Sequence, residues 1–225
     1  MPYGEKTKEQ LIEYSSKAFE FFESKNVKAV VMACNTTSAV VYEELKNKYQ
    51  FKLYPLIQSV SKVFGDMQVK SLGVFATPAT INSHAYSKWI NKFNPNIEVT
   101  EISCPEWVKI VENNETETQN AIISVEKKMK QMIEYNPDKI ILGCTHYPYL
   151  IKQLSKYAPK EIFINPANTY AKFIKSDLAE NDMLNNSNVN GKDEFYVTAN
   201  LEKFTKAGSR FYNVHNVIEV NVNIL

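Results

Sequence analysis

Two short stretches of this 225-residue chain each place a cysteine where an apolar run of strand type ends. Residues 30–37 read Val-Val-Met-Ala-Cys-Asn-Thr-Thr, and residues 140–146 read Ile-Ile-Leu-Gly-Cys-Thr-His. A helical pattern comes after each stretch. Cys34 and Cys144 therefore occupy equivalent places in two similar strand-to-helix turns, and we expect the two thiols to face each other across one small-molecule site.

A thiolate at a helix N-terminus is favoured by the helix dipole and by free N–H groups, which lower the pKa of the thiol. Two such thiols can remove a proton from one face of a carbon and return one to the other face. Racemisation of an amino acid without a cofactor requires this chemistry. Neighbouring polar groups could hold the α-carboxylate and ammonium, and His146 could hydrogen-bond to Cys144 or protonate it. The polar neighbours are Asn35, Thr36, Thr37 and Thr145.

Strand-type runs alternate with helical patterns along the chain and define the elements that must position these residues. We expect strands at residues 28–33, 50–58, 72–76, 97–102, 139–143, 161–164, 194–198 and 217–222, the second being a strand or an extended connection. We expect helices at residues 7–24, 38–49, 81–93, 107–112, 119–135, 148–157, 166–180 and 201–211. The alternation predicts an α/β fold with mainly parallel sheets. Ligands bind such sheets at the carboxyl ends of the strands, where both cysteines lie.

The composition favours a small-molecule partner. Lys and Arg number 26 against 25 Asp and Glu, a net charge of +1, which argues against nucleic acid as a partner. No apolar run is long enough to cross a membrane, and the first residues lack the apolar region of a signal peptide. Three cysteines without a disulfide framework fit a reduced compartment. We therefore expect a cytoplasmic protein that binds no membrane.

Other residues that could do chemistry have simpler interpretations. Cys104 stands before a proline without a polar turn, and we expect it to be buried as a small apolar side chain. His84 lies in a helical pattern and His215 near the C-terminus, so we expect structural and surface roles. No C-x-x-C or H-x-x-x-H spacing predicts a metal site. No lysine motif or phosphate-binding glycine loop predicts a cofactor, so we expect none.

The chain resembles the glutamate racemases of the aspartate/glutamate racemase superfamily over essentially its whole length. The matching blocks are Pro2 to Lys6 (Pro-Tyr-Gly-Glu-Lys), Ala33 to Thr36, Gly73 to Thr77 with Thr80, Cys104-Pro105 with Val108, Val111 and Glu112, Leu142 to Pro148, and Phe195 to Thr198. The two cysteine blocks in this order, with the intervening blocks, form a specific pattern, whereas Tyr-Gly or Cys-Pro alone would be weak.

The resemblance implies that Cys34 and Cys144 are the paired acid and base, each serving one enantiomer of glutamate, and that Glu112 and His146 assist the thiols. Its implied substrate contacts are Tyr3, Gly4, Asn35, Thr36, Thr77, Thr80, Thr145 and His146. It also implies two similar α/β lobes with the site in the cleft between them, the first from residues 1–58 plus 168–225 and the second from residues 59–167. A homodimer and a role in supplying D-glutamate for peptidoglycan, hence in cell-wall biogenesis and cell shape, are further implications.

One departure from the family pattern leaves alternatives open. Members of the family normally begin some forty residues earlier, with a strand that ends in Asp-Ser-Gly, a helix and a second strand. The given sequence lacks these, so we expect an incomplete first lobe and activity limited at Cys34, whose side the missing aspartate serves. The alternatives are a non-catalytic remnant that only folds or binds, and an aspartate racemase or related dicarboxylate isomerase.

Overall fold

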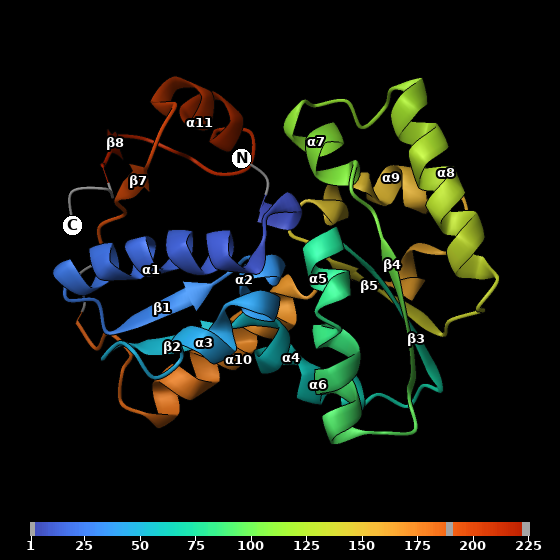
Figure 1. The fold of residues 1–225 in the computed structure, drawn as a ribbon, viewed down its shortest axis with the longest axis horizontal. Helices are drawn as coiled ribbons and strands as arrows, with labels where there is room; N and C mark the ends of the chain where they lie inside the picture. The colour runs from blue at the N-terminus through green and yellow to red at the C-terminus, as the bar shows by residue number, and fades with distance from the viewer. Residues whose placement is uncertain (1–2, 188–190, 222–225) are drawn as a thin grey trace.

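Figure 1 shows helices packed around parallel sheets, which confirms the predicted α/β class. The computed structural model describes residues 3–187 and 191–221. Within these ranges the strands form sheets of four, two and two strands, and every strand pair is parallel. None of the helices in the described ranges combines the length and apolar character needed to cross a membrane.

The four-stranded sheet has the order β4-β3-β5-β6. Its strands are β3 (Ser71–Ala76), β4 (Glu98–Ser103), β5 (Lys139–Gly143) and β6 (Phe163–Ile164). Ala76 pairs with both Ser103 and Gly143, so β3, β4 and β5 end at the same level. Thr77 and Cys144, the next residues along β3 and β5, therefore leave the sheet side by side at its carboxyl edge.

Side chains alternate between the two faces of this sheet, and each face has its own core. The surrounding helices are α4 (Leu56–Gly65), α5 (Pro78–Asn82), α6 (Ala85–Phe93), α7 (Trp107–Glu112), α8 (Gln119–Ile133) and α9 (Ile151–Leu154), with the 3-10 turns η2 (Tyr147–Leu150) and η3 (Lys160–Ile162). Phe75 and Leu142 pack with α7, α8 and α9. Val74 and Ile141 pack with α4 and α6. Burial on both faces explains why these strands read as continuous apolar runs.

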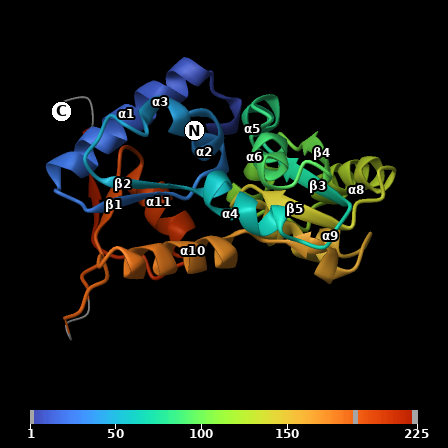
Figure 2. The same ribbon diagram turned by 90° about the horizontal axis from the view of Figure 1, so that it is seen from below.

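A smaller sheet, β1-β2, lies between α1 and α10 (Figure 2). Its elements are α1 (Lys8–Ser24), β1 (Ala29–Met32), α2 (Asn35–Val40), α3 (Tyr42–Leu45), β2 (Lys52–Pro55) and α10 (Ala167–Glu180). Thr7 and Gln10 form a capping box at the start of α1, each side chain accepting from the backbone N–H of the other. Leu11, Phe19 and Met32 belong to the core beneath this helix.

The C-terminal part contributes β7 (Phe195–Val197), α11 (Leu201–Gly208) and β8 (Val217–Glu219), with β7 and β8 paired. The Tyr196 ring lies 5.0 Å from the Phe21 ring of α1. The Phe211 ring lies 4.5 Å from the Tyr149 ring of η2. This segment therefore contacts both α1 and the turn after Cys144.

Two predicted helices are each divided in the structure, and one helix was not predicted. The helix expected at residues 38–49 begins earlier, at Asn35, and is divided into α2 and α3 at Val41. The helix expected at residues 81–93 is divided into α5 and α6 by His84, whose φ of 51° is left-handed and interrupts a right-handed helix. Helix α4 was not predicted, because its apolar run continues directly from β2 and resembles a longer strand.

The remaining differences concern boundaries. The helix expected at residues 148–157 is the 3-10 turn η2 followed by the short α9, and the strand expected at 161–164 is reduced to its last two residues by η3. The predicted strand 217–222 ends at Glu219, and its residue 222 lies outside the described residues. The polar, Asn-rich residues 181–192, for which the sequence predicts a surface loop, include residues 188–190, which also lie outside the described residues. The lobe boundaries at 58/59 and 167/168 stay a prediction.

Candidate active site

In each cysteine turn a backbone N–H donates to the cysteine carbonyl, but the donor lies four residues after Cys34 and three residues after Cys144. The backbone N–H of Ser38 donates to the Cys34 carbonyl at 3.0 Å, and that of Tyr147 donates to the Cys144 carbonyl at 3.1 Å. Cys34 is the N-cap of helix α2, whereas Cys144 precedes the 3-10 turn η2, whose N-cap is His146. The second turn therefore does not begin an α-helix directly.

Both thiols line one pocket of about 220 Å³. Its wall consists of Tyr3, Gly4, Cys34, Asn35, Thr36, Thr77, Val108, Glu112, Cys144, Thr145 and His146. These residues come from parts of the chain that are far apart in sequence and that meet at the carboxyl ends of β1, β3 and β5. The pocket wall includes every predicted site residue except Thr37 and Thr80, and it adds Val108. The Thr37 hydroxyl instead donates to the Cys34 carbonyl at 3.0 Å.

Thr80 belongs to a cluster of three buried hydroxyl groups beside the pocket. The Oγ1 atom of Thr36 lies 2.9 Å from that of Thr77 and 3.3 Å from that of Thr80, and Thr77 lies 3.0 Å from Thr80. Thr80 has no exposed surface. It therefore orients the hydroxyls of Thr36 and Thr77 from behind, which differs from the direct substrate contact predicted for it.

The short 3-10 turn η1 (Tyr3–Glu5) covers part of the pocket. A Cβ atom on Gly4 would lie 2.5 Å from the Thr77 Cβ, so only glycine allows this turn to approach α5 so closely. The carboxylate of Glu5 pairs with Lys109 of α7 at 2.8 Å. Burial raises the pKa of Tyr3, and its proximity to Cys34 adds to the shift.

Cys144, His146 and Glu112 form a row of three groups that can each bind or release a proton. The Cys144 Sγ lies 3.8 Å from His146 Nδ1, and His146 Nε2 lies 3.5 Å from Glu112 Oε1. Burial lowers the pKa of His146, and the neighbouring Glu112 charge partly opposes this. With Nε2 carrying its proton toward Glu112, Nδ1, which also lies 3.5 Å from the Thr145 hydroxyl, has a lone pair that can accept a proton from the thiol.

The sequence predicts that the turn lowers the pKa of the Cys144 thiol and favours a thiolate. The structure shows the opposite environment. Burial raises the pKa of this thiol to about 12, and the backbone N–H groups of His146 and Tyr147 offset the shift only in part. The side chain is 8% exposed, and the turn after it is a short 3-10 turn with a smaller dipole than an α-helix. Cys144 is therefore a protonated thiol near neutral pH.

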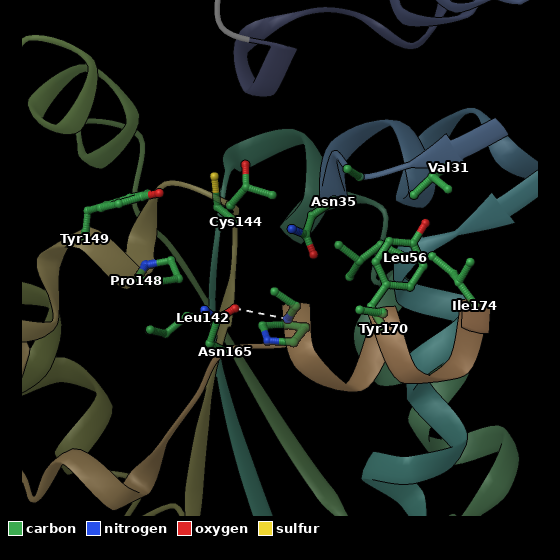
Figure 3. Close-up of a pocket in the computed structure, with 15 residues that line it drawn as sticks. Val31, Asn35, Leu56, Leu142, Cys144, Pro148, Tyr149, Asn165, Tyr170 and Ile174 are labelled. Atoms are coloured by element: carbon green, nitrogen blue, oxygen red, sulfur yellow. Dashed lines mark hydrogen bonds between the residues drawn. The ribbon is translucent and has the colours of Figure 1, made fainter. Parts of the chain in front are cut away.

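A larger cavity of about 470 Å³ adjoins the pocket (Figure 3). Cys144, Asn35 and Thr145 belong to the walls of both. Figure 3 shows Tyr170 and Ile174 of α10 on the side of this cavity away from Cys144. The rest of the wall of this larger cavity is mainly apolar, whereas the smaller pocket is also lined by Thr36, Thr77, Glu112 and His146.

Tyr86 of α6 was not among the predicted site residues, although it contacts the site. It is completely buried, and its hydroxyl donates to Asn35 Oδ1 at 2.7 Å. Burial raises the pKa of Tyr86, so the hydroxyl keeps its proton. In the sequence this tyrosine is one more apolar position of a helix, and no local signal separates it from the core.

The residues expected to have simpler roles lie outside the pocket wall. Cys104 is fully buried in the core around Trp107, and burial raises the pKa of its thiol far above the ordinary value. His84 lies 3.0 Å from the Glu101 carboxylate at the break between α5 and α6. His215 Nδ1 lies 3.1 Å from the carbonyl of Asn213.

The structure is that of an α/β protein whose two turn cysteines line one pocket at the carboxyl ends of parallel strands. The chain belongs to the Asp/Glu/hydantoin racemase family, whose model matches residues 4–173. It is 33% identical over 213 residues to a glutamate racemase of Lactobacillus helveticus, which covers 94% of this chain and 79% of the relative. It is 32% identical to a glutamate racemase of Carboxydothermus hydrogenoformans over all of this chain and 84% of the relative.

Among solved structures, the glutamate racemase of Francisella tularensis, crystallised with D-glutamate, is similar with a TM-score of 0.91 and 29% identity. The similarity covers all of this chain and 85% of the other. The relative's fold and the fold described here therefore correspond over the whole of this chain.

Proposed function

We propose that this chain is a glutamate racemase that interconverts L- and D-glutamate by proton transfer between two thiols, without a cofactor. The observation that carries the proposal is that Cys34 and Cys144 line one small pocket whose other walls offer hydroxyl, amide and imidazole groups. The family membership and the names of the relatives support glutamate, rather than aspartate, as the substrate.

In the proposed reaction one cysteine, as a thiolate, takes the α-proton of glutamate, and the other, as a thiol, gives its proton to the opposite face of the carbanion. For one enantiomer Cys144 starts as the thiol, the form that its raised pKa favours. For the other enantiomer it must first lose its proton. His146 Nδ1 is placed to accept that proton, and the Glu112 charge stabilises the imidazolium that results.

Neutral donors would hold the substrate. The described pocket wall contains no Lys or Arg, so the carboxylates of glutamate would bind to the hydroxyls of Thr36 and Thr145 and the amide of Asn35. These donors are uncharged, so they can bind the carboxylate without placing a full positive charge in the pocket. A full positive charge there would stabilise the thiolates and make them weaker bases.

Hydrogen exchange tests the proposal directly. Purified chain is incubated with L-glutamate in deuterium oxide, and deuterium at the α-carbon and the formation of D-glutamate are followed. We expect both in the wild-type chain, and no conversion of L- to D-glutamate in Cys34→Ala or in Cys144→Ala. Cys104→Ala, which changes a buried cysteine outside the pocket wall, is the matched control and should keep its activity.

Two results would count against the proposal. A folded, monodisperse sample that exchanges no α-proton would favour the alternative of a chain that only folds or binds. Faster conversion of L-aspartate than of L-glutamate would favour an aspartate racemase.

The cellular role is part of the same proposal: D-glutamate for peptidoglycan, hence cell-wall biogenesis and cell shape, made by a cytoplasmic enzyme. Expression of the chain in a bacterium that depends on added D-glutamate tests this role. Growth without the supplement, and no growth with Cys144→Ala, is the expected result. The homodimer expected from the family is a separate proposal, tested by light scattering of the purified chain.

A further inference from the structure

Tyr86 connects the two cysteine turns from beneath the pocket. It is anchored in the core of α6 with no exposed surface, and its hydroxyl donates to Asn35 Oδ1 at 2.7 Å. Asn35 directly follows Cys34 and lines the pocket. A buried tyrosine thus determines how a pocket amide is oriented.

The orientation leaves the amide nitrogen of Asn35 available to a ligand. Because Oδ1 accepts from Tyr86, the two N–H groups of Nδ2 point away from the tyrosine. Figure 3 shows this nitrogen on the side of Asn35 that faces Cys144. Among the described residues, none provides a hydrogen-bond acceptor for Nδ2, so its donors are directed at the space that a substrate would occupy.

The ring of the same tyrosine supports the other turn. Gly143 immediately precedes Cys144, and a Cβ atom added to Gly143 would lie 2.9 Å from Tyr86 Cε2. The ring therefore packs directly on the backbone of the second turn. One residue contacts the neighbour of Cys34 through its hydroxyl and the neighbour of Cys144 through its ring.

We propose that Tyr86 is a positioning residue that fixes the Asn35 amide as a hydrogen-bond donor to the substrate carboxylate and sets the spacing of the two cysteine turns. The inference rests on the proposed function for the identity of the substrate. Without the hydroxyl, the amide can rotate by half a turn and present Oδ1 to the carboxylate, which repels it. Tyr86 acts through Asn35 and does not itself touch the substrate.

A double-mutant cycle tests this coupling. The variants are Tyr86→Phe, Asn35→Ala and the double variant, and the readouts are KM, kcat and the Kd for D-glutamate from calorimetry. Tyr86→Phe keeps the ring on Gly143 and removes only the hydroxyl. We expect KM and Kd to rise by about 3- to 10-fold, the effect of one hydrogen bond, with kcat changed much less. The double variant should bind D-glutamate no more weakly than Asn35→Ala alone.

Tyr54→Phe is the matched control. Tyr54 is also buried, and its hydroxyl donates to Asp177 at 2.6 Å, away from the pocket. Its removal should lower the melting temperature and leave KM unchanged. If Tyr86→Phe likewise changes only the melting temperature, or if its effect on Kd multiplies with that of Asn35→Ala, the inference is overturned.

The cycle separates this inference from the proposed function. If the wild-type chain binds D-glutamate without racemising it, the proposed function fails, and the coupling between Tyr86 and Asn35 is still decided from Kd. If the wild-type chain racemises glutamate and the two substitutions act independently, the inference fails alone. A wild-type chain that neither binds nor racemises glutamate overturns both.

Discussion

Burial separates the environments of the two pocket cysteines. Cys144 is 8% exposed, whereas Cys34 is only half-buried. The pKa of Cys144 is raised first by burial and further by the charges of Cys34 and Glu112. Two adjacent thiolates repel each other, so the pocket disfavours ionisation of both thiols at once. A two-base proton transfer does not need that doubly ionised state, because it starts from one thiolate and one thiol.

The raised pKa of Cys144 predicts slow alkylation. At pH 8 only a very small fraction of Cys144 is a thiolate, and the thiolate is the form that reacts with iodoacetamide. We expect the rate of Cys144 alkylation to rise about tenfold per pH unit up to pH 10. Mass spectrometry of the peptide containing Cys144 measures this rate. In the urea-unfolded chain, with an ordinary thiol pKa, the rate should level off near pH 9. A plateau at the same pH in the folded chain would contradict the prediction.

The same shift makes stability depend on pH. Because the unfolded thiol ionises at about pH 8.5 and the folded one near 12, the unfolded state loses its proton first. The contribution of Cys144 is therefore fully present below pH 8.5 and is lost as pH rises toward 12. Cys144→Ala should reduce the fall in melting temperature over that interval.

Glu112→Gln tests the row of groups behind Cys144. Glu112 raises the pKa of His146, so its neutralisation should lower that pKa further and move the acid limb of kcat/KM to lower pH. His146 then becomes a weaker base, and we expect kcat to fall by about 10- to 100-fold. This is less than the roughly 10²- to 10⁴-fold of direct general-base catalysis, because Glu112 acts only through His146. The measurement is the pH profile of racemisation. Glu117→Gln is the control, since Glu117 pairs with Lys152 on the surface; an unshifted limb in Glu112→Gln would show that Glu112 does not act on His146.

At the scale of single residues, the sequence identified site residues that adjoin a recognisable turn in the chain. It missed residues that contact the site but lie far from it in sequence. Asn35, Thr145 and His146 adjoin the cysteines in the chain, so their presence at the pocket could be predicted. The bond from Tyr86 to Asn35 joins residues 51 positions apart. The high pKa of Cys144 likewise depends on burial by the folded chain, which the local pattern of a polar turn does not contain.

At the scale of elements, predictions succeeded where the periodicity was strong and the ends were marked. The bounds of α7 and β5 agree with those predicted, and α8 ends two residues before the expected position. The breaks at Val41 and His84 were missed, because the helical pattern of apolar residues continues through both. Helix α4 was missed because Pro55 was interpreted as part of an extended connection, although it is the N-cap of the helix.

Turn η1 is the element whose position depends most on one residue. In Gly4→Ala the new Cβ would lie 2.5 Å from the Thr77 Cβ, so η1 must move away from α5. We expect KM for glutamate to rise by about tenfold, since Tyr3 and the pocket wall move together, with a melting temperature lowered by only a few degrees. Steady-state kinetics and thermal denaturation measure the two effects.

Gly191→Ala is the control for this element, because no atom of the described residues lies within 4 Å of a Cβ atom at Gly191. It should leave both KM and melting temperature unchanged. An equal KM for Gly4→Ala and the wild-type chain would show that the contact of η1 with Thr77 does not shape the pocket.

At the scale of the whole molecule, the pocket joins segments from the two proposed lobes. Residues 3, 4 and 34–36 belong to the first proposed lobe, and residues 77, 108, 112 and 144–146 belong to the second. The hydroxyl cluster of Thr36 with Thr77 and Thr80 and the bond from Tyr86 to Asn35 cross the same boundary. A ligand in the pocket therefore adds contacts between parts of the chain that already share buried hydrogen bonds.

Ligand binding should accordingly stabilise the whole fold. D-glutamate at about 100 times its Kd stabilises the folded state by about 2.7 kcal/mol, which corresponds to a rise in melting temperature of about 5 to 10 °C for a chain of this size. Calorimetry at increasing D-glutamate concentrations measures the shift. D-alanine, which lacks the side-chain carboxylate, should give a smaller shift at the same concentration. Because contacts across the boundary couple the proposed lobes, the chain should unfold in a single thermal transition, and D-glutamate should raise the temperature of that whole transition. Two transitions, of which only one responds to D-glutamate, would mean that the ligand binds within a single lobe.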